Sequence, residues 1–123
     1  HGPKTRDVTV LLKKARNQLN NYFDATRKSF DLPLAPGGSK FQQTVWNWLR
    51  RIPYGQTRTY SDGAFAISTA PRAVGGACGR NPIPIIIPCH RVIKVSGRLG
   101  GFSAFNGLET KKVLLGLEGR TIS

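Results

Sequence analysis

The stretch "STAPRAVGGACGRNP", residues 68–82, decides the fold of this chain. Pro71 stands where a helix can begin, because the first turn of a helix does not use the N–H that proline lacks. The predicted helix consists almost wholly of small residues, and Arg72 is its one long side chain. A glycine costs a helix about 1 kcal/mol relative to alanine. The pair Gly75-Gly76 therefore has two explanations that the local sequence leaves open: tight packing against another helix, or close approach to a nucleic-acid groove.

A second short helix is expected just before this one. The segment "YGQTRTY", residues 54–60, predicts a turn, and we expect Ser61 to cap a helix that runs to about Ile67. Two short helices joined by a turn are typical of the helix-turn-helix motif of DNA-binding proteins.

Two longer helices are predicted upstream. Apolar residues recur at helical spacing from Val8 to Phe23, which indicates an amphipathic helix. Another helix is expected to begin after Ser39, whose hydroxyl can cap it while Gln42 bonds back, and to stop at Pro53. The predicted apolar stripe of that helix consists of Phe41, Val45, Trp48, Leu49 and Ile52.

The C-terminal third is expected to contain both strands and a helix. Ile83–Ile87 is interpreted as a buried extended segment, and a pair of β-branched strands is predicted around the turn at Ser96-Gly97. A last helix is predicted at about residues 108–117, and it ends near Glu118.

These elements predict a mixed α/β fold dominated by helices, with a winged-helix-like helix-turn-helix DNA-binding domain and a short sheet element. We expect residues 1–38 to be an N-terminal helix and connector, and residues 39–123 to be the functional domain. The chain of 123 residues contains no methionine, so His1 is not expected to be a native translation start, and more protein is expected to precede it.

The charge of the chain favours a nucleic-acid partner. Nineteen Lys and Arg against six Asp and Glu give a formal net charge of +13, spread along the sequence. Such a field attracts phosphate backbones. The longest apolar run, residues 83–88, is far shorter than the roughly 20 residues that a membrane span needs. We therefore expect a soluble, intracellular protein that does not enter a membrane.

The cysteines indicate reactivity rather than structure. Cys78 and Cys89 are too few for a disulfide framework or a four-ligand zinc site, so no metal is expected. A cysteine becomes a good nucleophile only as a thiolate, and His90 is a base next to Cys89. Neighbouring residues of a regular strand point to opposite faces, so the two can cooperate only if the chain breaks there, and Pro88 is a reason for a break. The alternative is an inert buried cysteine beside a histidine with a purely local hydrogen bond.

The sequence around this pair resembles a known family. "IPCHRV" is similar to the active-site signature of the O6-alkylguanine-DNA alkyltransferases, the methylated-DNA–protein-cysteine methyltransferases. Further segments resemble the same family in the same order, over about residues 11–119. They are "QLNNYF", "FDLPL", "FQQTVWNWL", "IPYGQTRTY", "RAVGGACGRNPIPIIIPCHRV" and "GLETKKVLLGLEG".

The resemblance implies a DNA-repair reaction that each molecule performs once. Cys89 would be the nucleophile and alkyl acceptor, His90 its base, and Glu118 the residue that orients His90. Asn81 would be a hinge between the recognition helix and the active-site turn. Tyr60 would donate a hydrogen bond to the guanine, and backbone groups of Cys89, Val92 and Ser103 would hold the base.

The resemblance also implies how DNA is bound. The helix from Pro71 would lie in the minor groove of double-stranded DNA, with Ala73 and Gly76 among the small residues that allow close approach. Arg72 would fill the space left by the flipped O6-alkylguanine, and Tyr60 would contact the DNA as well. No cofactor is implied. We expect a monomer, in a nucleus or in a bacterial or archaeal cytoplasm.

Two departures from the family and two other functions stay open. The segment from Tyr60 to Arg72 is two residues shorter than expected, with Gly63 where an aliphatic residue is expected, and the loop "GGFSAFNGLE" is bulkier than usual. One alternative is a non-catalytic alkyltransferase-like sensor of DNA damage, against which Cys89 argues. The other is a basic helix-turn-helix module in which Cys89 and His90 are structural.

Overall fold

The structure is a computed structural model that describes residues 5–32, 37–97 and 107–119. The chain divides into two compact units, His1–Ala35 and Pro36–Ser123, and each is described by itself. Among the described residues, no helix is long and apolar enough to cross a membrane.

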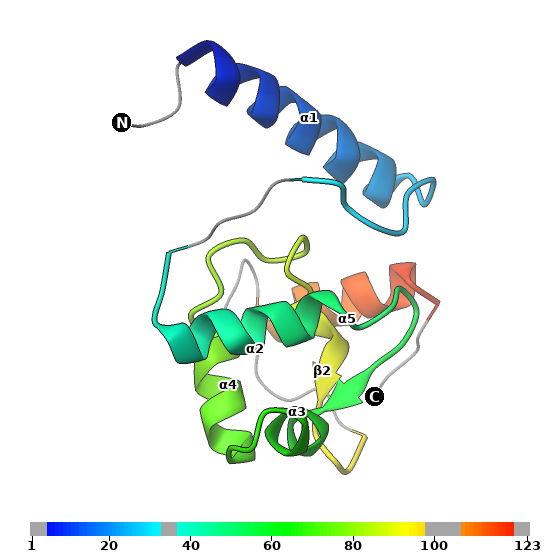
Figure 1. The fold of residues 1–123 in the computed structure, drawn as a ribbon. Coiled ribbons are helices and arrows are strands. Elements are labelled where there is room, and N and C mark those ends of the chain that lie inside the picture. Colours follow the sequence, from blue (N-terminus) through cyan, green and yellow to red (C-terminus); the bar gives the residue numbers. More distant parts are fainter. Residues whose placement is uncertain (1–4, 33–36, 98–106, 120–123) are drawn as a thin grey trace. The chain divides into compact units, whose positions relative to one another are not determined.

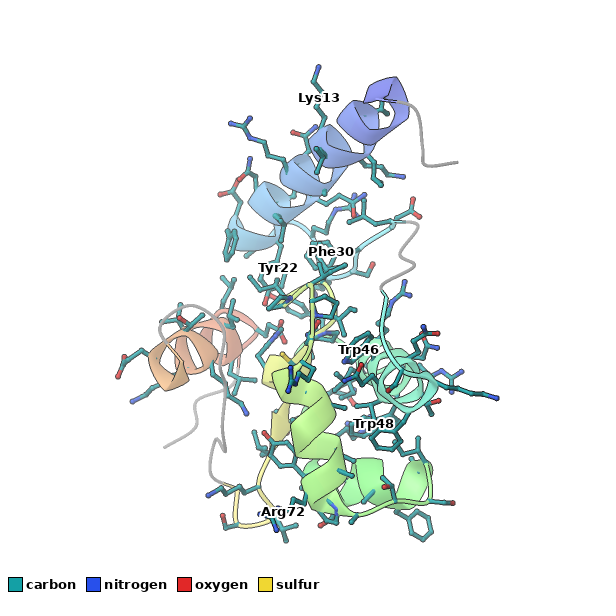
Figure 2. All side chains as sticks on the ribbon, turned by 90° about the vertical axis from the view of Figure 1, so that its left-hand side faces the viewer. Lys13, Tyr22, Phe30, Trp46, Trp48 and Arg72 are labelled. Carbon is teal, nitrogen blue, oxygen red and sulfur yellow. The ribbon has the colours of Figure 1, made fainter. Side chains whose placement is uncertain are left out.

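The first unit is built on helix α1, Thr5–Phe23, which begins three residues before the predicted start. The Gln18 side chain donates to the Asp31 carbonyl at 3.0 Å and accepts from the Asp31 N–H at 2.9 Å. These two bonds fold the following segment back along the helix. Tyr22 is fully buried and packs against Phe30, with 5.6 Å between the ring centroids (Figure 2).

The second unit begins with helix α2, Lys40–Arg50, and its start confirms the prediction. The Ser39 hydroxyl accepts from the Gln42 N–H at 3.1 Å, and the Gln42 side chain accepts from the Ser39 N–H at 3.0 Å. The predicted stripe is correct at Val45, Leu49 and Ile52, which are buried. It is wrong at Phe41, which is exposed, and at Trp48, which is only half-buried, whereas Trp46 is buried in its place. The Trp46 indole N–H donates to the Ala77 carbonyl at 2.9 Å, and this distant partner holds the ring inside.

Helices α3, Tyr60–Ala66, and α4, Pro71–Gly79, form the predicted pair, and α4 packs against both α2 and α3 (Figure 1). Pro71 begins α4 as expected. The cap predicted at Ser61 is wrong. Thr59 caps α3, because Asp62 lies three residues later and its carboxylate accepts from the Thr59 N–H at 2.8 Å. Ser61 has Ala64 at the corresponding position, which cannot bond back.

The structure explains the unexpected glycine of α3. A Cβ atom on Gly63 would lie 2.8 Å from ring carbons of Trp48 and 3.2 Å from a methyl carbon of Val74. Gly63 therefore lets α3 approach α2 and α4 more closely than a residue with a side chain would allow.

The sheet consists of strand β1, Arg58–Thr59, and strand β2, Val92–Ile93, in parallel, with Arg58 opposite Val92 and Thr59 opposite Ile93. Within the described part of the chain, Val92–Ile93 therefore pairs with β1 and not with a strand on the other side of the Ser96-Gly97 turn, as was predicted. The turn itself is present, since the Gly97 N–H donates to the Lys94 carbonyl at 2.9 Å. Any return strand would lie beyond residue 97, outside the described residues.

The predicted extended segment at Ile83–Ile87 is also wrong. The Ile87 N–H donates to the Ile83 carbonyl at 3.0 Å, and Ile85 has a φ of +79°, so this segment is a compact turn. Helix α5, Leu108–Leu117, follows the sheet as predicted, and Glu118 caps its C-terminus. A helix-dominated fold with one small sheet is confirmed for the described residues.

Candidate active site

Cys89 and His90 lie in a short 3₁₀ helix, η1, Cys89–Arg91, between the isoleucine turn and β2. The Cys89 N–H donates to the Ile87 carbonyl at 2.8 Å, and the Arg91 N–H donates to the Pro88 carbonyl at 3.0 Å. The chain therefore leaves the extended conformation at this pair, as the sequence argument required. Both residues are buried.

Glu118 lies 28 residues after His90 and meets it at the site. His90 Nε2 and Glu118 Oε2 are 2.7 Å apart, and both side chains are fully buried. Since the carboxylate only accepts hydrogen bonds, Nε2 carries the hydrogen of the neutral ring. The other ring nitrogen, Nδ1, is buried and has no hydrogen-bond partner among the described residues. Nδ1 is thus the nitrogen that can take up a proton.

Burial keeps both Cys89 and His90 neutral at rest. Burial raises the pKa of the Cys89 thiol, while a hydrogen bond from the Asn81 side chain and the charge of Lys111 lower it in part. Burial lowers the pKa of His90, against the opposing effect of Glu118. The Cys89 side chain is therefore a thiol and not a thiolate before the reaction. A proton has to leave the thiol during the reaction.

Asn81 ties the end of α4 to the turn that carries Cys89. Its side-chain amide donates to the Ile87 carbonyl at 2.7 Å and accepts from the Ile83 N–H at 2.9 Å. Asn81 thereby holds both ends of the turn Ile83–Ile87.

Tyr60 lies at the start of α3, and a Cβ atom on Gly75 would be in ordinary contact with its ring at 3.8 Å. Burial, with the nearby thiols Cys78 and Cys89, raises the pKa of Tyr60 to about 12. Its hydroxyl therefore keeps its proton and can donate it. Cys78 is a second, half-buried thiol near these groups, and burial raises its pKa to about 12.

The sequence analysis missed Lys111 of α5. Its side chain is fully buried, and its ammonium donates to the Val92 carbonyl at 2.6 Å and to the Tyr60 hydroxyl at 3.4 Å. Burial lowers the pKa of Lys111 to about 8, and Cys89 and Cys78 act in the opposite direction. One signal was available. Lys111 precedes Glu118, the C-cap of α5, by seven residues, which is about two helical turns, so the two residues lie on the same side of the helix axis.

The candidate DNA-binding residues lie on α4. Arg72 and Gly76 are exposed, and Ala73 is half-buried. A Cβ atom on Gly76 would meet no atom of the described residues within 4 Å. Figure 2 shows Arg72 at the end of α4 away from Trp46. Ser103 lies outside the described residues. The structure thus brings together Cys89, His90, Glu118, Asn81, Tyr60 and Val92, while Arg72 lies at the far end of the helix.

Comparison with known protein sequences finds one family, the DNA methyltransferases that act on O6-methylguanine. Residues 40–120 match the family model described as 6-O-methylguanine DNA methyltransferase, DNA binding domain. The methylated-DNA–protein-cysteine methyltransferase of Methanosarcina acetivorans is 53% identical over 111 residues, which is 89% of this chain and 70% of that protein. The constitutive methyltransferase of Bacillus subtilis is 48% identical over 112 residues, 89% of this chain and 67% of that protein.

Solved structures agree with this result. The Mycobacterium tuberculosis OGT, crystallised in complex with DNA, superposes with a TM-score of 0.82 at 48% identity, covering 86% of this chain and 65% of that one. S. pombe Atl1, crystallised with damaged DNA containing O6-carboxymethylguanine, has a TM-score of 0.59 at 28% identity, covering 68% of this chain and 80% of that one.

The fold and the site together define a helix-turn-helix DNA-binding domain that carries a buried cysteine beside a histidine–glutamate pair. Such a domain is the DNA-binding and catalytic part of a DNA-repair methyltransferase. The chain belongs to the methylated-DNA–protein-cysteine methyltransferase family.

Proposed function

We propose that this protein repairs O6-alkylguanine in double-stranded DNA by moving the alkyl group irreversibly to Cys89. The observation that supports this most directly is the buried 2.7 Å contact between Glu118 and His90, the residue that follows Cys89 in η1. That contact leaves Nδ1 of His90 as a base within a site from which bulk water is excluded.

In the proposed step, the Cys89 sulfur attacks the alkyl carbon on guanine O6. The S–C bond forms as the C–O6 bond breaks, and the thiol proton passes through a water molecule to His90 Nδ1. Glu118 stabilises the imidazolium that results. The product is a thioether with no route back to a thiol, so each molecule reacts once.

The leaving guanine needs a proton donor and a fixed position. The Tyr60 hydroxyl donates to the guanine ring as negative charge develops, and the high pKa of Tyr60 keeps that proton available. Backbone groups of Cys89, Val92 and Ser103 hold the base. The Val92 carbonyl already accepts from Lys111, but a carbonyl oxygen has a second lone pair for the base.

Helix α4 is proposed to enter the minor groove, and the target nucleotide is flipped out of the stack. The open surface around Gly76 supports close approach of the groove, and the exposed Arg72 fills the space that the base leaves. One monomer suffices for this reaction, which would take place wherever the cell keeps its DNA.

The decisive experiment is intact-mass measurement after mixing the protein with an oligonucleotide that contains O6-methylguanine. We expect a gain of one methyl group per molecule, mapped to Cys89, and no second turnover. Cys89→Ser should give no gain in mass yet still bind DNA, whereas the matched variant Cys78→Ser should react. Methylation at Cys78, or repeated turnover, would contradict the proposal, and binding without any transfer would favour a damage sensor.

A further inference from the structure

We propose that Arg91 is a positioning residue of this site: its guanidinium holds the Glu118 carboxylate in the orientation that His90 requires. The inference rests on the proposed role of His90 as the base. Arg91 was not among the residues that the sequence or the family resemblance assigned to the reaction.

The geometry is that of a two-pronged ion pair. Arg91 Nε donates to Glu118 Oε1 at 2.8 Å, and Arg91 Nη2 donates to Glu118 Oε2 at 3.0 Å. Glu118 Oε2 is also the atom that lies 2.7 Å from His90 Nε2. The guanidinium therefore fixes the oxygen that orients the imidazole. Both side chains of the ion pair are buried, so its geometry is not averaged by solvent.

Arg91 is itself held from two further sides. Its Nη1 donates to the Ile52 carbonyl, just after α2, at 2.8 Å. Its guanidinium carbon lies 5.7 Å from the centre of the Tyr54 ring, and the Tyr54 hydroxyl donates to the Leu117 carbonyl at 3.1 Å. Arg91 thus connects η1, the end of α2 and the end of α5 at one point.

The Arg91–Glu118 ion pair compensates a negative charge in an unfavourable place. Glu118 caps the C-terminus of α5, where the helix dipole disfavours a negative charge, and burial disfavours it further. Arg91 compensates that charge. Burial is the main cause that lowers the pKa of His90, and the charge of Arg91 lowers it further. Arg91 therefore favours a charged carboxylate and, together with burial, a neutral imidazole, which is the state that can accept a proton.

The variant Arg91→Lys tests whether the geometry of the Arg91 guanidinium matters in addition to its positive charge. A lysine at residue 91 keeps a positive charge but cannot bond both carboxylate oxygens and the Ile52 carbonyl in one plane. We expect Arg91→Lys to slow single-turnover transfer from free O6-benzylguanine by about ten-fold and to change its pH profile. The free base makes the assay independent of DNA binding. Arg51→Met, at an exposed arginine next to Ile52, is the matched control and should react like the unmodified protein.

A double-variant cycle distinguishes positioning from a merely structural ion pair. If Arg91 acts through Glu118, adding Arg91→Lys to Glu118→Gln should cause little further loss of rate. Losses that multiply independently, or an Arg91→Lys protein that reacts at the normal rate with the normal pH profile, would overturn the proposal.

Two further measurements apply if the Arg91→Lys variant does not fold or if the protein does not transfer the benzyl group. If Arg91→Lys does not fold, the proposal is tested by the carboxyl ¹³C signal of Glu118 in the unmodified protein. A Glu118 carboxyl that titrates across the active pH range would overturn the proposed role of Arg91. Alkylation of Cys89 by iodoacetamide needs no guanine. If benzyl transfer is absent but this alkylation slows in Arg91→Lys, the proposed function fails while the positioning role stands.

Discussion

At the scale of single residues, the site pairs a thiol and an imidazole that burial keeps neutral. Raising the pKa of Cys89 removes thiolate at rest, and lowering the pKa of His90 weakens the base that must accept the proton. Glu118 opposes the second effect, because its hydrogen bond and charge raise the pKa of His90. The reactivity of Cys89 is therefore expected to depend on Glu118, through the effect of that carboxylate on His90.

Glu118→Gln tests this dependence. Loss of the carboxylate removes the influence that raises the pKa of His90, so the imidazole accepts the thiol proton less readily and the apparent pKa of Cys89 rises. We expect transfer to slow by ten-fold or more, or about 1.4 kcal/mol in the barrier, with DNA affinity nearly unchanged. The measurement is the pH profile of single-turnover transfer. Profiles that coincide with those of the unmodified protein would remove Glu118 from the mechanism.

At the scale of elements, α4 resolves the question that its glycines raise. Packing against the described residues does not require Gly75 or Gly76. A Cβ atom on Gly75 would make an ordinary contact, and one on Gly76 would meet no described atom within 4 Å. Gly63 of α3 is different, since its Cβ would lie 2.8 Å from the Trp48 ring. Gly63 is explained by the fold, whereas Gly75 and Gly76 are left for an external partner such as the DNA groove.

Gly76→Ala and Gly63→Ala form a matched pair. Alanine at residue 76 should stabilise the fold by about 0.5–1 kcal/mol, because it favours the helix at an open position, and should weaken DNA binding. Alanine at residue 63 should destabilise the fold by about 1–3 kcal/mol through overpacking. Urea unfolding and DNA titration of both variants supply the measurements. A Gly76→Ala protein with unchanged DNA affinity would argue against α4 as the groove-binding element.

Arg72→Ala tests the other end of α4. Because Arg72 is exposed, its loss should leave the fold intact. We expect repair of duplex DNA to slow by far more than reaction with free O6-benzylguanine, since a free base needs no flipping. Comparing single-turnover rates on the two substrates makes the check, and equal losses on both would assign Arg72 a role in folding instead.

At the scale of the whole molecule, the main feature is a formal net charge of +13. The site accounts for little of it, because Arg91 is matched internally by Glu118. The remaining excess is available to neutralise phosphates, which release counterions into solution when the protein binds.

Salt should therefore weaken binding to undamaged duplex steeply and with little regard to sequence. We expect log affinity to fall linearly with log salt between about 50 and 200 mM. Fluorescence anisotropy with two duplexes of unrelated sequence makes the measurement. An affinity that stays flat across this range would show that phosphate neutralisation is not the main attraction.

Two of the predictions that succeeded concern residues close together in the sequence. The Ser39–Gln42 capping box and the start of α4 at Pro71 were read correctly, because each depends on residues within one helical turn. Thr59 was missed as the cap of α3 because two hydroxyl residues, Thr59 and Ser61, stand two positions apart, and only the position of Asp62 distinguishes them. The family resemblance, rather than any pattern, pointed to Glu118.

The sequence by itself determined the helices, the helix-turn-helix order and the break in the chain at Pro88, since backbone preferences and short-range hydrogen bonds specify these locally. Tertiary structure alone decided that Trp46 rather than Trp48 is buried, and that β2 pairs with β1. It also placed Arg91 and Lys111 at the site. Packing of α5 against η1 creates those contacts across 19 residues or more, and no local preference specifies which buried charges will meet.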